Sequence, residues 1–278
     1  MPLRALKTAD ELVYQISGPE DAPAIAYLPG VHGDWTPNEA ARAHLSSEAR
    51  LLEVAYPHRE DWTLGDFVAS LVRLFDRLDI GSAHLVGESF GSLVAWEAGF
   101  TQPGRVNSLL LVGGFVQPPP YGVATSAKWF LRGLPTPALE LGIDTYVRYK
   151  SRKGERRLAR SPGVSPYAAS RTRGGKRATA SRMAIIERSD VRERLRRVSH
   201  PVRYIGGGSD LVIPVTRELE TLSKYLPAHT GFEGHLIDRA PHAIIASHPE
   251  KTARALVGWV NEIEQSRQAT KRRQPALA

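Results

Sequence analysis

The chain has 278 residues and a net charge of +8, and its 42% hydrophobic and 24% charged residues are ordinary proportions for a globular protein. It contains no cysteine, which excludes disulfide bonds, thiolate metal sites and a cysteine nucleophile. No apolar run reaches the roughly 18 residues of a membrane helix, and the first residues lack the apolar core of a signal peptide. We therefore expect a cytoplasmic protein without a membrane span.

Strand-like and helix-like stretches alternate through the first half of the chain and again near its end. The strand candidates are rich in β-branched and aromatic residues, and some are nearly continuous apolar runs, as in strands that are buried on both faces of a parallel sheet. We predict strands at residues 11–17, 24–28, 50–56, 83–87, 108–112, 202–206 and 235–238, and helices at residues 64–78, 90–100, 216–226 and 249–264.

The helix predicted at residues 64–78 has the clearest pattern. Its apolar residues recur at spacings of three and four, which places them on one face of a helix. Thr63 is a plausible N-cap, and Asp66 three residues later can complete a pair that resembles a capping box. This pattern indicates an amphipathic helix that packs on a sheet.

The alternation stops after Phe115, where the prolines at 118–120 mark an exit from the regular pattern. We predict an α/β fold, with one mostly parallel sheet and helices on both of its faces. Residues 1–115 and 201–264 form its core, and residues 116–200 form an inserted cap that includes a loop at 163–179. Residues 265–278 are expected to form a flexible basic tail.

The positive charge is concentrated in the predicted cap, where residues 148–203 contain 18 Lys and Arg against 4 Asp and Glu. These cations either form a solvated cover or bind an anionic acyl substrate, and the salt dependence of KM separates the two alternatives. No nucleic-acid-binding motif or aromatic platform accompanies the charge, so we do not predict a nucleic-acid partner.

The strongest catalytic signal is the pentapeptide Gly87-Glu88-Ser89-Phe90-Gly91, which follows a predicted buried strand and opens a predicted helix. A serine on such a sharp turn presents its hydroxyl outward, and the flanking glycines are needed because the strand and the helix crowd them. The helix N-terminus also favours negative charge beside the serine. Ser89 is therefore the predicted nucleophile.

A serine hydroxyl needs a base, and in strand–turn–helix sites of this type the acid and then the histidine follow the serine along the chain. Asp210 lies just after the strand at 202–206, and His242 lies between the strand at 235–238 and the last helix. Asp238 is a rival acid, but it is too close to His242 in sequence to share a site comfortably. We predict that Asp210 orients His242, which acts as the general base.

Two backbone N–H groups are needed to stabilise an oxyanion. One should belong to Phe90, directly after the nucleophile, and we assign the other to Val31 in the glycine-containing loop after the strand at 24–28. Gly30, His32 and Glu88, which neighbour these donors, are predicted to contact the substrate.

These motifs together resemble the α/β-hydrolase superfamily. The resemblance rests on LPGVHGDW at 28–35, LVGESFGS at 85–92, GGGSD at 206–210 and APHAII at 240–245. It implies an eight-stranded, mostly parallel sheet with a helical cap after the sixth strand. Family members commonly have His-Gly where this chain has Pro29-Gly30, which favours Val31 as the second oxyanion donor, whereas the alternative register through His32-Gly33 moves that donor to Asp34.

The residues and the resemblance together predict a serine hydrolase that cleaves a small-molecule carboxylic ester, thioester or lactone. The mechanism requires no cofactor and no metal. The alternatives are a cofactor-free lyase, an acyltransferase or a perhydrolase that uses the same residues, or a non-catalytic ligand-binding protein on the same scaffold. The acyl group, the leaving group and the oligomeric state do not follow from the sequence.

Overall fold

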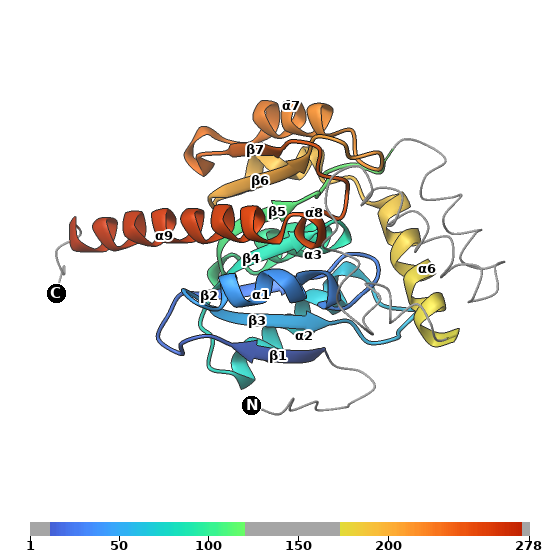
Figure 1. Cartoon of the computed structure of the whole chain (residues 1–278), viewed down its shortest axis with the longest axis horizontal. Helices are drawn as coiled ribbons and strands as arrows, with labels where there is room; N and C mark the ends of the chain where they lie inside the picture. Colours follow the sequence, from blue (N-terminus) through green and yellow to red (C-terminus); the bar gives the residue numbers. More distant parts are fainter. Residues whose placement is uncertain (1–11, 120–172, 274–278) are drawn as a thin grey trace.

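The computed structural model describes residues 12–119 and 173–273, which form a single sheet between two layers of helices (Figure 1). Seven strands lie in the order β1-β3-β2-β4-β5-β6-β7. Among the described strands only β1 is antiparallel, where it pairs with β3 at the edge. The strands are β1 (Val13–Ser17), β2 (Ala24–Leu28), β3 (Arg50–Ala55), β4 (Ala83–Glu88), β5 (Val106–Val112), β6 (Val202–Gly207) and β7 (Glu233–Ile237).

The predicted α/β architecture is confirmed, and the sheet contains seven strands within the described residues, where eight were expected. The central strand β4 is buried along its whole length, as its apolar sequence indicates. The predicted strands all exist, with ends that differ from the expected ones by at most two residues.

One face of the sheet is covered by α1 (Glu39–Leu45), α8 (Ile244–Ser247) and α9 (Pro249–Arg273), which lie in front of the strands in Figure 1. The other face is covered by α2 (Leu64–Arg77), α3 (Phe90–Thr101) and α7 (Val215–Tyr225). Each face has its own apolar core, because side chains of consecutive strand residues point to opposite sides of the sheet.

The helix α2 has the amphipathic pattern and the capping box that its sequence predicts. Thr63 Oγ1 accepts a hydrogen bond from the N–H of Asp66, and the Asp66 carboxylate accepts one from the N–H of Thr63 at 2.7 Å. Its buried residues include Phe67, Leu71 and Phe75, which pack on the sheet. Helix α3 differs because it is buried on nearly all sides, as expected for a helix that begins at the centre of the sheet.

Two expectations of local structure are wrong, and one helix was missed. The loop predicted at 163–179 overlaps α6 (Arg173–Arg188), and the tail predicted at 265–278 is helical as far as the end of α9, while residues 120–172 and 274–278 lie outside the described ranges. The helix α1 was not predicted at all. In α6 the apolar residues Ala178 and Ile186 are buried against the body, so that tertiary packing outweighs the poor helix propensity of the two glycines near its start.

Within residues 12–119 and 173–273, no helix is both long enough and apolar enough to cross a bilayer. Between β5 and β6 the described chain contains α6 and a short 3-10 helix, η4 (Arg192–Arg197). Figure 1 shows α6 to one side of the sheet, across the ends of the strands. The predicted cap at 116–200 therefore remains a prediction for the residues between 120 and 172.

Candidate active site

The turn between β4 and α3 holds Ser89 in a conformation that L-amino acids rarely adopt, with φ 50° and ψ −115°. Such a backbone costs on the order of 1–3 kcal/mol and persists only where the surrounding structure enforces it. The N–H of Ser89 donates to the carbonyl oxygen of Val112 in β5 at 3.0 Å, which ties the turn to the neighbouring strand. The predicted strand–turn–helix setting of the serine is thus present.

The two glycines of the pentapeptide are required by close backbone contacts. A Cβ atom on Gly91 would lie 2.0 Å from the carbonyl oxygen of Leu28, and one on Gly87 would lie 2.8 Å from that of Gly91. Real Cβ atoms essentially never approach other atoms so closely. Any side chain at either position would therefore push the start of α3 away from the sheet.

Ser92 supports this turn from inside the helix. Its hydroxyl donates to the carbonyl oxygen of Ser89 at 2.6 Å and accepts from the N–H of Phe115 at 3.2 Å. The residue therefore connects the strained turn to the segment that leaves β5.

Three side chains from separate elements meet beside this turn in one chain of hydrogen bonds. His242 Nε2 lies 2.9 Å from Ser89 Oγ, and His242 Nδ1 lies 2.8 Å from Asp210 Oδ2. An ionised carboxylate only accepts hydrogen bonds, so Nδ1 carries the ring proton and the lone pair of Nε2 faces the serine hydroxyl. The structure thus brings the predicted nucleophile, base and acid together.

The loops that hold Asp210 and His242 pack against each other at the ends of β6 and β7. The N–H of Ser209 donates to the carbonyl oxygen of Ala240 at 2.9 Å. A Cβ atom on Gly207 would lie 2.5 Å from that same oxygen, so only glycine allows the two loops to approach this closely. Glycine at the end of β6 thereby sets the distance between the acid and the histidine.

The loop after β2 passes directly against the nucleophile. A Cβ atom on Gly30 would lie 3.4 Å from Ser89 Cβ and 3.1 Å from the ring of His32. The N–H of Gly33 donates to the carbonyl oxygen of Gly30 at 3.0 Å and closes a tight turn around Val31. Phe90 is the first residue of α3, so its N–H has no acceptor within the helix. Both predicted oxyanion donors thus lie on segments that adjoin Ser89.

A model of the "Alpha/beta hydrolase family" matches residues 28–255, which is most of the chain and includes all of these segments. The chain belongs to the alpha/beta hydrolase family. It is an enzyme of the hydrolase class, and the resemblance predicted from its motifs is confirmed.

Two curated proteins are similar to this hydrolase in sequence. It is 27% identical over 267 residues to 3-oxoadipate enol-lactonase 1 of Acinetobacter baylyi, with 91% of this chain and 94% of the relative covered. It is 30% identical over 210 residues to pimeloyl-[acyl-carrier protein] methyl ester esterase of Methylococcus capsulatus, with 72% and 77% covered.

Solved structures agree with the fold. The enol-lactonase from Burkholderia xenovorans superposes with a TM-score of 0.72 at 19% identity, covering 90% of this chain and 96% of that one. A hydrolase from Pseudomonas aeruginosa gives the same TM-score at 18% identity, covering 90% and 94%. These likenesses show that the hydrolase shares their architecture.

The groups around Asp210 keep its carboxyl ionised although the side chain is fully buried. Burial by itself raises the pKa of this carboxyl, but the hydrogen bond and the charge of His242 lower it, as do the N–H groups of Ile213 and Val212, at 3.0 and 2.8 Å from Oδ1. The net pKa lies below the ordinary value. Asp210 is therefore a fixed negative charge behind the imidazole.

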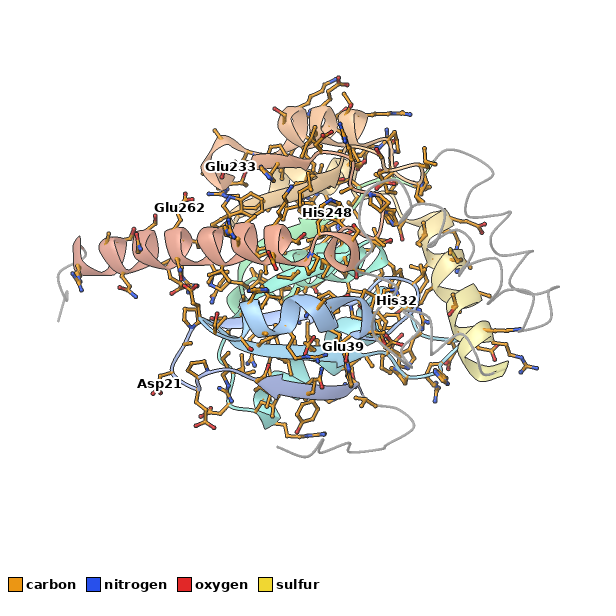
Figure 2. All side chains as sticks on the ribbon, viewed as in Figure 1. Asp21, His32, Glu39, Glu233, His248 and Glu262 are labelled. Carbon is orange, nitrogen blue, oxygen red and sulfur yellow. The ribbon has the colours of Figure 1, made fainter. Side chains whose placement is uncertain are left out.

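His32 and Glu88 have partners of their own. His32 Nε2 lies 2.9 Å from the carbonyl oxygen of Asp34, and its buried ring, labelled in Figure 2, lies at the edge of the sheet that faces α6. Glu88 is buried, and its carboxylate accepts a hydrogen bond from the hydroxyl of Tyr27 on the α9 side of the sheet. The geometry thus gives Glu88 a partner inside the protein in place of the predicted contact with substrate.

No role was predicted from the sequence for three residues near the site, which are two glycines and one arginine. Gly113, with φ 56°, packs against His242, and a Cβ atom on Gly114 would lie 2.7 Å from Ser92 Cβ. Two consecutive glycines directly after a buried strand are a sequence signal that could have indicated these close contacts. Arg182 belongs to the cations for which the sequence leaves two alternatives, a solvated cover or an anion site, but its spacing of four residues from both Ala178 and Ile186 places it on the buried stripe of α6.

Across the part of the chain that the structure describes, no group of three or more His, Asp or Glu side chains is arranged to hold a metal ion. The predicted mechanism uses none.

Proposed function

We propose that this hydrolase cleaves a carboxylic ester, thioester or lactone of a small molecule through a covalent acyl-enzyme. Ser89 is the nucleophile, His242 the general base and Asp210 the residue that orients His242. The observation that carries the proposal is the unbroken hydrogen-bond chain from Asp210 Oδ2 through the imidazole to Ser89 Oγ, with distances of 2.8 and 2.9 Å.

In the first step, Ser89 Oγ attacks the acyl carbonyl carbon while its proton passes to His242 Nε2. The carbonyl oxygen becomes an oxyanion, which the N–H groups of Val31 and Phe90 stabilise. The bond to the leaving oxygen or sulfur then breaks, and His242 returns the proton to the leaving group. In the second step, water loses a proton to His242 and attacks the acyl carbon. The bond to Ser89 Oγ then breaks, His242 returns the proton to that oxygen, and the carboxylic acid leaves.

Similarity to an enol-lactonase and to a methyl ester esterase supports lactones and simple esters as the first substrates to test. In a lactone, the leaving oxygen stays attached to the acyl group, so the acyl-enzyme carries its own alcohol or enol. Water must then compete with reclosure of the ring, and a site that admits a positioned water favours hydrolysis.

The test is turnover of a panel of p-nitrophenyl esters, methyl esters, thioesters and lactones by the wild-type protein and by Ser89→Ala. We expect the variant to lose at least about 10³-fold in kcat, because removal of the nucleophile costs more than loss of one oxyanion donor. A fluorophosphonate probe, which loses fluoride as Ser89 Oγ bonds to phosphorus, should label the wild-type protein and spare the variant.

Equal turnover by both proteins would contradict the proposal, and so would labelling of the variant to the wild-type extent. Products distinguish the alternatives: hydrolysis yields the free acid in water, whereas an acyltransferase passes the acyl group to an added alcohol or amine in preference to water.

A further inference from the structure

One arginine side chain of helix α6 is buried and contacts the loop after β2, which holds the predicted oxyanion donor Val31. Arg182 is only 2% exposed, although it lies in the most basic part of the chain. Its Nε donates to the carbonyl oxygen of Val31 at 2.8 Å, and its Nη2 donates to Thr179 Oγ1 at 3.1 Å. Its Cζ also lies 5.8 Å from the centroid of the Tyr56 ring. Burial of a guanidinium is costly unless its donors form hydrogen bonds, and these two bonds go to neutral oxygen atoms.

The loop that contacts this guanidinium has a glycine at the point of closest approach. Gly33 has φ 87°, and a Cβ atom there would lie 2.8 Å from Arg182 Nη2 and 3.0 Å from Cζ. The carbonyl oxygen of Gly33 accepts from the N–H of Tyr56 at 2.7 Å, so the turn is also tied to the end of β3. Glycine at 33 therefore serves both the left-handed backbone and the close approach of the guanidinium.

The contacts fix the direction of the Val31 N–H. This N–H belongs to the same peptide as the carbonyl of Gly30, and the two groups of a trans peptide point in opposite directions. The bond from Gly33 to that carbonyl orients the peptide on one side of Val31. The bond from Arg182 to the Val31 carbonyl orients the peptide on the other side. Together they leave the Val31 N–H little freedom to rotate.

The remaining contacts of α6 anchor the helix to the body. Ser181 Oγ donates to the carbonyl oxygen of Glu60 at 2.6 Å, and Arg177 lies 3.5 Å from the Glu60 carboxylate. Because α6 is fixed in this way, the guanidinium of Arg182 acts from a defined position.

We propose that Arg182 is a positioning residue of the oxyanion hole: it holds the Val31 carbonyl from α6 and so keeps the Val31 N–H aimed at the developing oxyanion. This inference rests on the proposed function, because it assigns Val31 as a donor in that reaction. Arg182 itself touches no reacting atom. A planar fork with several donors suits the task, since it binds Val31 and Thr179 at once and lies close against Gly33.

The experiment compares the wild-type protein with Arg182→Met, Arg182→Lys and the control Arg188→Met. Arg188 is exposed on the same helix, and its Nε donates to the carbonyl oxygen of Ala184, so its variant tests for a general effect of lost charge. Each protein is assayed with a p-nitrophenyl ester and with the matching thionoester, whose sulfur accepts hydrogen bonds poorly. The ratio of the two kcat values reports on how well the donors are aimed.

We expect Arg182→Met to lower kcat for the oxygen ester by about 10- to 100-fold, to change KM by no more than about threefold, and to reduce the oxygen-to-sulfur ratio by about tenfold. Arg182→Lys should give values between those of the wild-type protein and Arg182→Met, because lysine keeps the charge but lacks the rigid planar fork of donors. Arg188→Met should keep the wild-type ratio.

A folded Arg182→Met with the wild-type ratio overturns the inference, even if its kcat is lower, because that result describes a purely structural residue. If Arg182→Met does not fold, Arg182→Lys decides in the same way, and Thr179→Val, which removes only one partner of the guanidinium, provides a milder third variant. Failure of the proposed function appears differently, as a wild-type protein that neither turns over the oxygen ester nor reacts with a fluorophosphonate at Ser89.

Discussion

Glu218 offers the sharpest test of the energetics of this fold. It lies in the first turn of α7, is 1% exposed, and its Oε1 accepts a hydrogen bond of 2.6 Å from the N–H of Val116, where the chain leaves the core. The carbonyl oxygen of Val116 accepts from the N–H of Val191, where the chain returns. Burial raises the pKa of Glu218 from 4.5 to about 7, and the N–H of Val116 and the charges of Arg217 and Arg192 only partly oppose it, while Asp190 adds to the increase.

A carboxyl whose pKa is higher in the folded protein binds a proton more tightly there than in the unfolded chain. Its contribution to stability is therefore fully present below pH 4.5 and is lost as the pH rises through 7. At about 1.4 kcal/mol for each pH unit, ionisation of Glu218 costs the folded protein up to about 3 kcal/mol at pH 8.

The perturbation is Glu218→Gln, which retains a carbonyl oxygen for Val116 and removes the ionisation. Its free energy of unfolding should match that of the wild-type protein near pH 4.5 and exceed it by up to about 3 kcal/mol at pH 8, with the difference developing between pH 5 and 7. The assay is urea denaturation followed by circular dichroism at half-unit steps of pH. Glu220→Gln, at an exposed position on the same helix, is the matched control. A difference between Glu218→Gln and wild type that stays constant from pH 5 to 8 would refute the reasoning.

Three further changes test the geometry of the site. Asp210→Asn should lower kcat on a p-nitrophenyl ester by about 10³–10⁴-fold with little change in melting temperature, because the amide no longer selects the productive tautomer of His242; a loss below tenfold would contradict this. Ser92→Ala leaves the N–H of Phe115 without its acceptor and should reduce the free energy of unfolding in urea by about 1–3 kcal/mol, and an unchanged midpoint would argue against the contact. Gly91→Ala places a Cβ atom 2.0 Å from a backbone oxygen of β2 and should abolish soluble, folded protein, so a variant with a wild-type spectrum would show that the turn tolerates a side chain.

Local patterns in the sequence predicted most of the fold. A buried parallel strand is a nearly continuous apolar run, and an amphipathic helix repeats its apolar residues at spacings of three and four. The run before Gly87 predicted β4, and the spacing of apolar residues from Leu64 onward predicted α2 with its capping box. The helix α1 escaped prediction because it is short and buries only Ala41 and Leu45. The end of α9 escaped it because polar residues continue a helix without an apolar pattern.

The sequence by itself determined which groups could react, because the glycines around Ser89 and the order of Ser89, Asp210 and His242 along the chain are local chemical signals. Only the tertiary structure decided their distances, the burial of Glu88 beside Tyr27 and the contact between Arg182 and Val31. Arg182 resembles its basic neighbours in sequence. Its spacing from Ala178 and Ile186 indicates that it faces inward, but its partner Val31 lies 151 positions away, and a contact over such a separation leaves no signal in the sequence.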